Sequence, residues 1–373
     1  MDKIRRFRAQ GQKVAILSMD ASSAFDLLDH EVILRSLEVI GAGPLIQKLT
    51  NSFLKDCKNF VQIGDSQSES WTVTTGSGQG RRLSPDYFNL SCISQAILCL
   101  IAEFIGYADD GIDIVHGSTP AECDEKLQAV ANERVNWYSQ IGLSLNISKT
   151  QILGIGYSPA RIILQGNTIH PSSDITFLGM TIQSDLKWSR QITSLCNKIR
   201  SAAGRIRYEG RNLNIWDRRA LYMGWIQSLV HYNALVVLST SSATDLSSVQ
   251  TACNAGIRAV MGLKKYGYVD ITSLRKSLGI QSVESIIELN LLGAAWKHFS
   301  TSSLCSPRQT TGPFTRGMAK HNIPHPDQRG HMAKAPHTIL TKARNRILLE
   351  IKNANNFKSA KRLLKTFLYH QQL

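Results

Sequence analysis

The sequence predicts an α+β fold, in which an antiparallel sheet carries helices on one face and an all-α region follows. Up to residue 186, short runs rich in β-forming residues alternate with amphipathic helical patterns. From 187 to 300 the spacing of apolar residues is helical throughout. Residues 301–337 hold five of the ten prolines, which indicates a linker before a last basic helix over 338–373. The predicted domains are therefore 1–186, 187–300, 301–337 and 338–373.

The first elements are a buried strand and an amphipathic helix. Residues 14–19, VAILSM, form a short apolar run that ends at Asp20, which predicts a strand with a carboxylate at its C-terminal end. A helical pattern follows from Ala24 to Ile40 and stops at a cluster of two glycines and Pro44.

A hairpin and a glycine-rich turn come next. Residues 60–63 and 71–75 alternate as the two strands of a hairpin do. The turn GSGQG at 76–80 leads into an apolar helix that we expect to reach about Ile101.

The rest of the mixed region contains one well-marked helix among short strands. A strand ends at Tyr107–Asp110, and residues 112–115 are its expected return partner. Thr119-Pro120-Ala121-Glu122 combines a capping box with proline at the first helical position, and apolar residues follow at helical spacing. Further short strands are predicted at 150–154, 161–165 and 175–183.

The charge of the chain indicates a polyanionic partner. There are 43 Lys+Arg against 28 Asp+Glu, a net charge of +15. Residues 301–373 hold 13 basic and two acidic residues, and the stretch from Lys187 to Arg219 holds nine basic and two acidic. Solvated helix faces and a phosphate-contacting surface are both open explanations of this second cluster.

Composition also excludes several classes of protein. No apolar stretch approaches the ~20 residues that span a bilayer, so we expect no membrane partner and a soluble intracellular protein. The seven cysteines form no CxxC pair and are odd in number, which argues against a zinc ribbon or a disulfide framework.

Two acidic features indicate chemistry: Asp20 at the end of a strand, and the pair Asp109-Asp110 in a strand-turn-strand junction. Consecutive strand residues point to opposite faces, so the pair can serve one site only at a tight hairpin. Carboxylates without adjacent His or Cys favour Mg²⁺ or Mn²⁺ over zinc. With Asp20 alongside, three carboxylates can bridge two cations, an arrangement suited to nucleotidyl transfer. Alternatively, each Asp only ends its strand and caps a turn.

The residues around these carboxylates resemble the palm motifs of reverse transcriptases. The stretch SMDASSAFD at 18–26, followed by Asp29-His30, and YADD at 107–110 fit in order and spacing. Further stretches agree: GSGQG at 76–80 with Leu83-Ser84-Pro85 and Phe88-Asn89, GLSLN at 142–146 with Lys149-Thr150, and FLG at 177–179. The set is most similar to the non-LTR (LINE-type) retrotransposon polymerases.

The resemblance implies roles at the catalytic centre. Asp20, Asp109 and Asp110 would be catalytic carboxylates that bind two Mg²⁺ ions, with Mn²⁺ as a substitute, and the carbonyl of Ala21 would be an extra ligand. Lys149 would reach the leaving phosphate; a plain surface lysine is the alternative.

The resemblance also implies a nucleotide-binding group. Phe25 would lie against the sugar 2′ position and favour deoxynucleotides, although a core-packing aromatic is the alternative. Gln79 and Gly80 would lie under the templating pair, since glycine lets the backbone approach a ligand closely; a plain turn before a helix is the alternative.

The primer and duplex would be held further along the chain. Phe177, Leu178 and Gly179 resemble the primer-gripping turn, and residues 187–300 resemble the thumb. The thumb residues expected to follow phosphates are Lys198, Arg200, Arg205, Arg207 and Arg211.

The sequence departs from the family in places. It starts a dozen residues before the first palm strand, so we expect the fingers and the endonuclease of LINE proteins to be missing. Arg81, Arg82 and Asp86 stand where small or apolar residues are usual, and they are expected to disturb Gln79.

The leading hypothesis is an RNA-directed DNA polymerase fragment, with an RNA template, a DNA primer or duplex and dNTPs as partners. A catalytically inactive, truncated retrotransposon remnant that only binds nucleic acid is the alternative. Nucleotide cyclases also place two acids on a palm-like sheet, but they need neither the glycine-rich turn nor a basic helical domain. Nuclear localisation is implied by the family alone, and the oligomeric state stays open.

Overall fold

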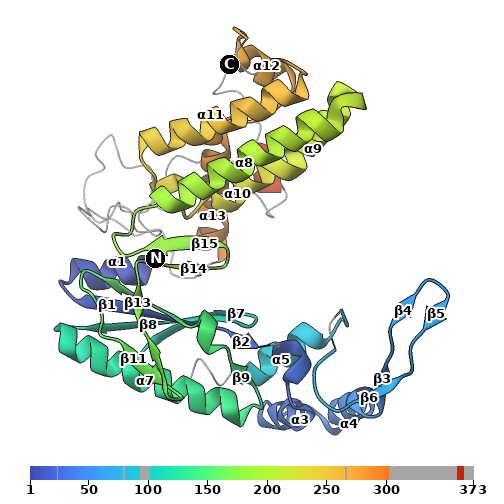
Figure 1. Cartoon of the computed structure of the whole chain (residues 1–373), viewed down its shortest axis with the longest axis vertical. Coiled ribbons are helices and arrows are strands. Elements are labelled where there is room, and N and C mark those ends of the chain that lie inside the picture. The colour runs from blue at the N-terminus through green and yellow to red at the C-terminus, as the bar shows by residue number, and fades with distance from the viewer. Residues whose placement is uncertain (23, 79, 93–100, 265–266, 302–358, 365–373) are drawn as a thin grey trace, which may run out of the picture. The chain divides into compact units, whose positions relative to one another are not determined.

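The computed structural model describes residues 1–22, 24–78, 80–92, 101–264, 267–301 and 359–364, and these form two compact units (Figure 1). The sheet unit comprises Gln10–Leu186, and the helical unit comprises Met1–Ala9 with Lys187–Leu373. The first nine residues thus belong to the helical unit and not to the region predicted over 1–186. Most of the predicted linker and of the last helix lies outside the described residues.

A five-stranded sheet of order β13-β10-β1-β8-β7 forms the centre of the sheet unit. Its middle strand is β1 (Lys13–Met19), flanked antiparallel by β8 (Asp110–Gly117) and β10 (Gln151–Ile155). The edges are β7 (Glu103–Tyr107), antiparallel to β8, and β13 (Pro171–Ser172), parallel to β10. The predicted combination of sheet and helices is confirmed, but the prediction of a purely antiparallel sheet is wrong at the β10–β13 pair.

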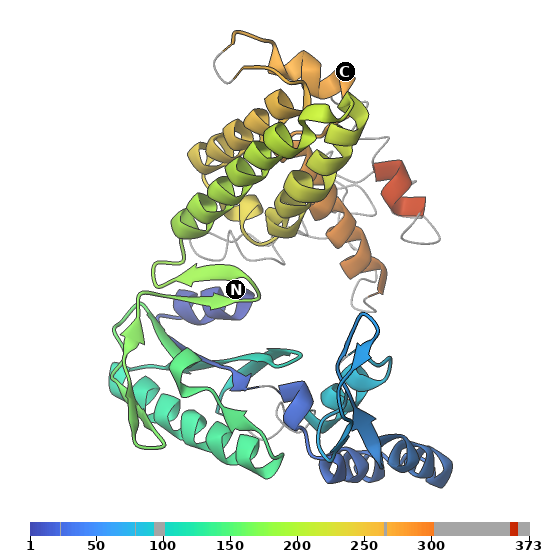
Figure 2. The same cartoon turned by 45° about the vertical axis from the view of Figure 1, so that its right-hand side comes forward.

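Helix α7 (Pro120–Gln140) covers one face of this sheet (Figure 2). It begins at the predicted capping box, where the Thr119 side chain accepts a hydrogen bond from the Glu122 backbone N–H. Its apolar residues share one buried cluster with alternate residues of β1 and β8: Ala15, Leu17, Val115, Cys123, Leu127, Val130 and Ala131. Burial of this face fixes the register of the strands that end at the acidic residues.

The chain after β1 is more broken than its pattern indicates. β2 (Ala21–Ser22) and α2 (Ala24–Leu27) are followed by α3 (His30–Val39), because Asp29 accepts a hydrogen bond from the Glu31 N–H and begins a new helix. The single helix predicted from Ala24 to Ile40 is therefore wrong. Helix α4 (Pro44–Leu54) packs against α3.

This region forms a hairpin, but the predicted pairing of residues 60–63 with 71–75 is wrong. β3 (Cys57–Asn59) pairs with β6 (Trp71–Val73), and β4 (Gln62–Ile63) pairs with β5 (Ser66–Gln67) beyond them. α5 (Ser84–Cys92) begins the helix predicted after the glycine-rich turn, and the rest of that prediction lies outside the described residues.

Short elements complete the sheet unit. β9 (Ser144–Leu145) pairs with β2, and a 3₁₀ turn, η1 (Ile147–Lys149), follows it. Two small hairpins come later: β11 (Ile162–Leu164) with β12 (Asn167–Ile169), and β14 (Asp174–Phe177) with β15 (Met180–Gln183).

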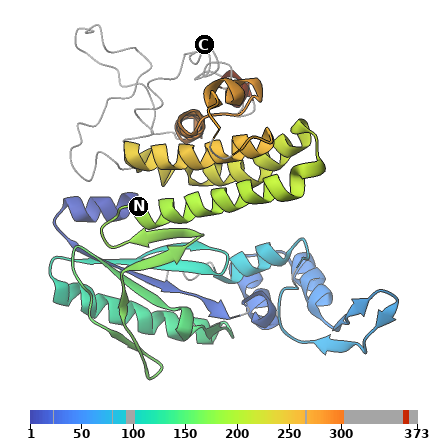
Figure 3. The same ribbon diagram turned by 45° about the horizontal axis from the view of Figure 1, so that its top comes forward.

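Helices make up the helical unit, as the apolar spacing predicts. α8 (Ser189–Glu209) and α11 (Ala243–Val260) lie side by side (Figure 3). The remaining elements are α1 (Asp2–Ala9), η2 (Gly210–Asn212), α9 (Ile215–Tyr222), the π-helical η3 (Met223–Gln227), α10 (Ser228–Ala234), η4 (Leu238–Thr240), α12 (Ile271–Ser277) and α13 (Val283–Thr301). Within the described part of the chain, no helix is long and apolar enough to cross a membrane.

Candidate active site

A tight hairpin carries two of the predicted carboxylates. Tyr107 of β7 pairs with Asp110 of β8, so Ala108 and Asp109 alone form the turn. Ala108 has φ of 52°, a conformation that costs a residue with a Cβ about 1–2 kcal/mol. A tight turn of this kind allows the carboxylates of two neighbouring acidic residues to face one site. Backbone strain of this kind is typical of functional sites.

The central strand brings the third carboxylate to this hairpin. Met19, the last residue of β1, pairs with Gly111 of β8, and Asp20 comes next. Asp20 therefore follows β1 at the end where Asp110 begins β8. The Asp20 side chain is 21% exposed, which leaves its oxygens accessible from solvent.

Lys149 completes the charged group. Its Nζ lies 2.9 Å from Asp20 Oδ2. The backbone holds the two together, since the Asn146 N–H donates to the Asp20 carbonyl at 2.8 Å and Ala21 pairs with Leu145. The hydrogen bond to Asp20 raises the pKa of Lys149, so this ammonium stays charged at neutral pH.

The carboxylates also act on each other. Burial raises the pKa of Asp110, the negative charges of Asp109 and Asp20 raise it further, and Lys149 opposes the rise. Burial raises the pKa of the Cys92 thiol to about 12, and the charge of Asp109 adds to that rise, so the thiol stays protonated. Cys92 was not among the predicted site residues, because nothing in its sequence position relates it to Asp109.

The glycine-rich turn is hydrogen-bonded to α2 and to the residue that follows it. The Gly76 N–H donates to the Leu28 carbonyl at 2.7 Å, and the Ser77 N–H donates to the Phe25 carbonyl at 2.9 Å. Gly76 has φ of 91°, and a Cβ there would lie 2.7 Å from the Asp26 carbonyl oxygen. Only glycine fits this close approach.

The structure describes only one of the two residues that were predicted at the end of this turn. Gln79 lies outside the described residues. Gly80 is exposed with φ of 79°, a backbone conformation that glycine adopts without strain.

Phe25 is part of the packed interior beside this turn. Its ring stacks on Phe88 with centroids 4.5 Å apart, and it packs against the buried cluster of the sheet unit. This is the contact that a core-packing aromatic makes, so the proposed contact with a sugar stays a prediction.

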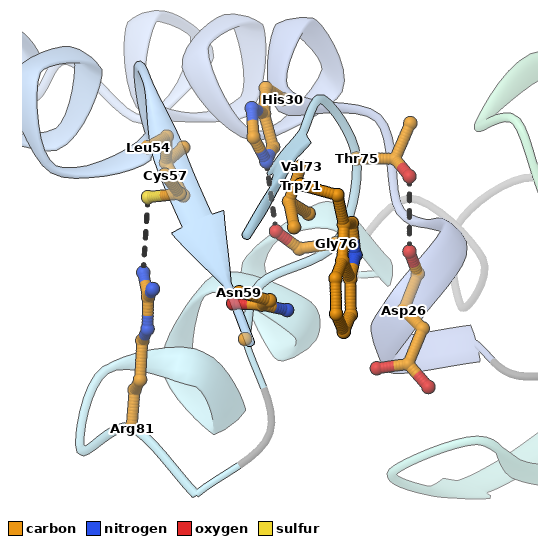
Figure 4. A pocket seen from close by; sticks show the side chains of 11 residues that line it. Asp26, His30, Leu54, Cys57, Asn59, Trp71, Val73, Thr75, Gly76 and Arg81 are labelled. Carbon is orange, nitrogen blue, oxygen red and sulfur yellow. Dashed lines mark hydrogen bonds between the residues drawn. The ribbon is translucent and has the colours of Figure 1, made fainter. Parts of the chain in front are cut away.

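A cavity of about 510 Å³ adjoins the glycine-rich turn (Figure 4). His30 contacts the Gly76 carbonyl through Nε2 at 2.9 Å, and the half-exposed ring of Trp71 stands among the lining side chains. The Arg81 guanidinium donates to Cys57 Sγ at 3.5 Å and lies over the Phe53 ring. Arg81 is thus held by α4 and β3, and His30 fixes the turn, a role that its place in the motif did not reveal.

The predicted primer-gripping residues form a two-residue hairpin turn. Phe177 pairs with Met180, and Leu178 and Gly179 both have positive φ, 48° and 69°. Two positive φ values are typical of the type I′ turns that fit the twist of a hairpin. A grip on a primer stays a prediction.

The predicted phosphate-contacting residues lie in the helical unit. Ile192, Leu195 and Ile199 are among the buried residues of α8, whereas its basic side chains are exposed. All of the predicted basic residues are exposed: Lys198, Arg200, Arg205 and Arg207 on α8 and Arg211 in η2. Arg205 lies over the Trp225 ring, and Arg211 lies over the Tyr208 ring.

The donor set of the acidic group fits a hard divalent cation. Among the residues that the structure describes, no three His, Cys, Asp or Glu side chains form a ready-made metal site. The oxygens of Asp20, Asp109 and Asp110 are nevertheless the ligand type that Mg²⁺ and Mn²⁺ prefer. Burial raises the pKa of Asp110, the repulsion from Asp109 and Asp20 raises it further, and a bound cation would relieve that repulsion.

Comparisons with known proteins identify the first half of the chain. The family described as "Reverse transcriptase (RNA-dependent DNA polymerase)" matches residues 2–182. The transposon TX1 uncharacterized 149 kDa protein of Xenopus laevis is 27% identical over 161 residues, 38% of this chain and 12% of that protein. The RNA-directed DNA polymerase from mobile element jockey of Drosophila funebris is 22% identical over 261 residues, 66% of this chain and 28% of that protein.

The chain thus spans about an eighth to a quarter of the length of these relatives. Among solved structures, apo telomerase from Candida tropicalis gives a TM-score of 0.42 at 13% identity, covering 82% of this chain and 54% of that one.

Proposed function

The chain belongs to the reverse transcriptase family, in its non-LTR (LINE-type) retrotransposon branch, and from this premise we propose that it extends a DNA primer on an RNA template. The observation that carries the proposal is the convergence of Asp20 and the Asp109-Asp110 hairpin at one end of the sheet, beside Lys149. In this proposal the sheet unit is the palm and the helical unit contains the thumb.

Asp20, Asp109 and Asp110 would hold two divalent cations, with the carbonyl of Ala21 as an extra ligand. Such ions, when bound, lower the pKa of an attacking 3′-hydroxyl and neutralise charge on the leaving pyrophosphate. Lys149 is 65% exposed and charged, so its ammonium can stabilise negative charge on a leaving phosphate while Asp20 keeps it in place.

The glycine-rich turn and Phe25 would shape the nucleotide site. Gly76 and Ser77 donate directly to the backbone carbonyls of Leu28 and Phe25, so the turn and the chain around Phe25 are linked. Phe25 would restrict the sugar 2′ position, and Gln79 with Gly80 would support the templating pair.

The nucleic acid would be held by the primer turn and the basic helix. Phe177, Leu178 and Gly179 would contact the primer, and the exposed basic residues of α8 and η2 would contact phosphates of the duplex. Binding of this kind is independent of sequence and weakens steeply with salt. Action in the nucleus belongs to the same proposal.

Template-primer extension tests the proposal. The full chain is incubated with an RNA template, a DNA primer, dNTPs and Mg²⁺, and compared with Asp109→Ala/Asp110→Ala and with Asp65→Ala, an exposed acid in the turn between β4 and β5. Extension by wild type and Asp65→Ala but not by the double variant supports polymerase activity. Salt-sensitive RNA binding without any extension by wild type would instead support an inactive remnant.

A further inference from the structure

The hairpin that carries Asp109 and Asp110 has two paired glycines beside its turn, and these bring no side chains that could hold the turn in place. Gly106 of β7 pairs with Gly111 of β8, and this pair directly precedes the Tyr107–Asp110 pair at the turn. Glycines inside strands weaken them, since they lose the most conformational freedom and bring no side chain to pack. The position of the two carboxylates must therefore be fixed by contacts elsewhere.

A buried arginine beneath the sheet makes such contacts. Arg134 of α7 is 1% exposed and donates two hydrogen bonds to Asp113 of β8, from Nε at 2.9 Å and from a terminal nitrogen at 2.7 Å. This bidentate arrangement fixes direction as well as distance. Asp113 is itself 3% exposed.

The same guanidinium reaches the other strand of the hairpin. It lies 4.6 Å from the centroid of the Phe104 ring on β7, and Phe104 is the residue that pairs with Asp113. The Phe104 ring in turn lies over Gly106, where an added Cβ would be 2.7 Å from the ring edge. Arg134, Asp113 and Phe104 therefore support both strands next to the glycine pair, on its side away from the turn.

These residues act on the carboxylates only through the backbone. Strand alternation puts Asp113 and Gly111 on the face covered by α7, and Asp110 on the opposite face. Arg134 contacts Asp113 and Phe104 on the face that α7 covers, away from Asp110, so it is a positioning residue and not a catalytic one.

Stability alone does not account for this ion pair. Taking both charges out of water offsets most of their attraction, and well-packed apolar pairs often replace such ion pairs without loss of stability. The pair does fix one geometry between α7 and the hairpin, which an apolar contact does not.

We infer that Arg134 is a positioning residue that, through Asp113 and Phe104, sets the place of the Asp109-Asp110 turn. The effect on metal binding rests on the proposed function, whereas the effect on the hairpin does not.

The test uses the full chain and three variants. Arg134→Lys keeps the charge and loses the bidentate fork, and Arg134→Met/Asp113→Leu replaces the pair by apolar side chains. Lys126→Met is the control, since Lys126 lies on the same helix and pairs with Glu122 near the surface. Urea unfolding reports global stability, hydrogen exchange of the 106–111 amides reports the hairpin, and Mn²⁺ titration reports the carboxylates.

We expect both Arg134 variants to exchange the 106–111 amides faster, on the order of tenfold, as a locally opened segment does. Loss of such supporting contacts should weaken Mn²⁺ binding about 10–100-fold. The double variant should keep the urea midpoint of wild type, and Lys126→Met should change none of the three readouts.

The inference is overturned if folded Arg134 variants exchange these amides and bind Mn²⁺ as wild type does. If Arg134→Lys lowers the urea midpoint, hydrogen exchange and Mn²⁺ binding of the double variant decide whether the inference holds, because that variant should keep the midpoint of wild type. If wild type binds no Mn²⁺, the proposed metal role fails, and hydrogen exchange alone decides the positioning role.

Discussion

The two units differ in the sign of their charge and in how their functional residues are fixed. Residues 10–186 carry 19 acidic and 11 basic residues, a net charge of −8, whereas residues 187–301 carry 6 acidic and 15 basic, a net charge of +9. The carboxylates of the sheet unit meet because three strands pair in one register. The basic residues of α8 need only the period of a helix whose other face is buried.

Under the proposed function, this difference in charge predicts that metal chemistry and nucleic-acid affinity are separable in this chain. An acidic unit attracts cations and repels phosphates, and a basic unit does the reverse. Variants of one unit should therefore change one property and leave the other.

The largest expected effect is on catalysis by the sheet unit. Asp110→Asn keeps the size of the side chain but removes a charge from the carboxylate group, so primer extension should fall about 10²–10³-fold. Binding of template-primer at low salt should stay within about twofold, because the proposed function assigns most of the affinity to the basic residues of α8 and η2. A fall in binding as large as the fall in extension would contradict the separation.

The next effect is on nucleic-acid binding by the helical unit. Lys198→Ala/Arg207→Ala removes two exposed charges of α8, and the slope of log K against log salt should flatten by about 2. Arg35→Ala, which removes an exposed charge from the sheet unit, is the control and should leave the slope unchanged. Titrations of labelled duplex at several salt concentrations measure both.

Replacement of glycine by alanine should change the stability in opposite directions in the two units. Gly76→Ala meets a positive φ and a backbone oxygen 2.7 Å away, so it should cost about 1–3 kcal/mol of stability. Gly204→Ala lies in α8 with open space around it and should add about 0.5–1 kcal/mol. Urea unfolding gives both values, and equal signs would show that the turn is not held as described.

The smallest effect concerns a helix cap in the helical unit. Hydrogen bonds from Ser273 and Thr272 lower the pKa of Asp270, the N-cap of α12. A depressed folded pKa contributes stability that is present above the unfolded value, about 3.9, and is lost as pH falls through the folded pKa. Asp270→Ala should lower Tm slightly at pH 7 and by less at pH 3, whereas Asp270→Asn should keep the cap. A loss of Tm that is equal at both pH values would contradict this.

Much of the fold follows from local sequence. The apolar run before Asp20, the capping box before α7 and the helical period after 187 each predict the element that forms. The predictions fail where a single polar residue begins a helix, or where a strand that is distant in sequence determines the pairing. Asp29 begins a helix inside an amphipathic run, and β3 pairs with β6 in a register that alternation does not specify.

The candidate site shows the same limit. The acidic residues are visible in the sequence because their motifs are ordered, and the turn at Ala108-Asp109 is implied by their adjacency. The role of Arg134, the residue that supports them, is not visible in the sequence, because an arginine in a long helix ordinarily faces solvent. Its partner, Asp113, is 21 residues away on a strand, and only the packing of α7 on the sheet brings the two together.

Mn²⁺ binding followed by electron paramagnetic resonance tests the central claim most directly, since it needs neither template nor turnover. The full chain should bind Mn²⁺ in competition with Mg²⁺, and Asp65→Asn should bind equally well. Asp20→Asn/Asp110→Asn should lose this binding while staying folded by circular dichroism. Equal Mn²⁺ binding by wild type and the double variant would contradict the claim that these carboxylates form the metal site.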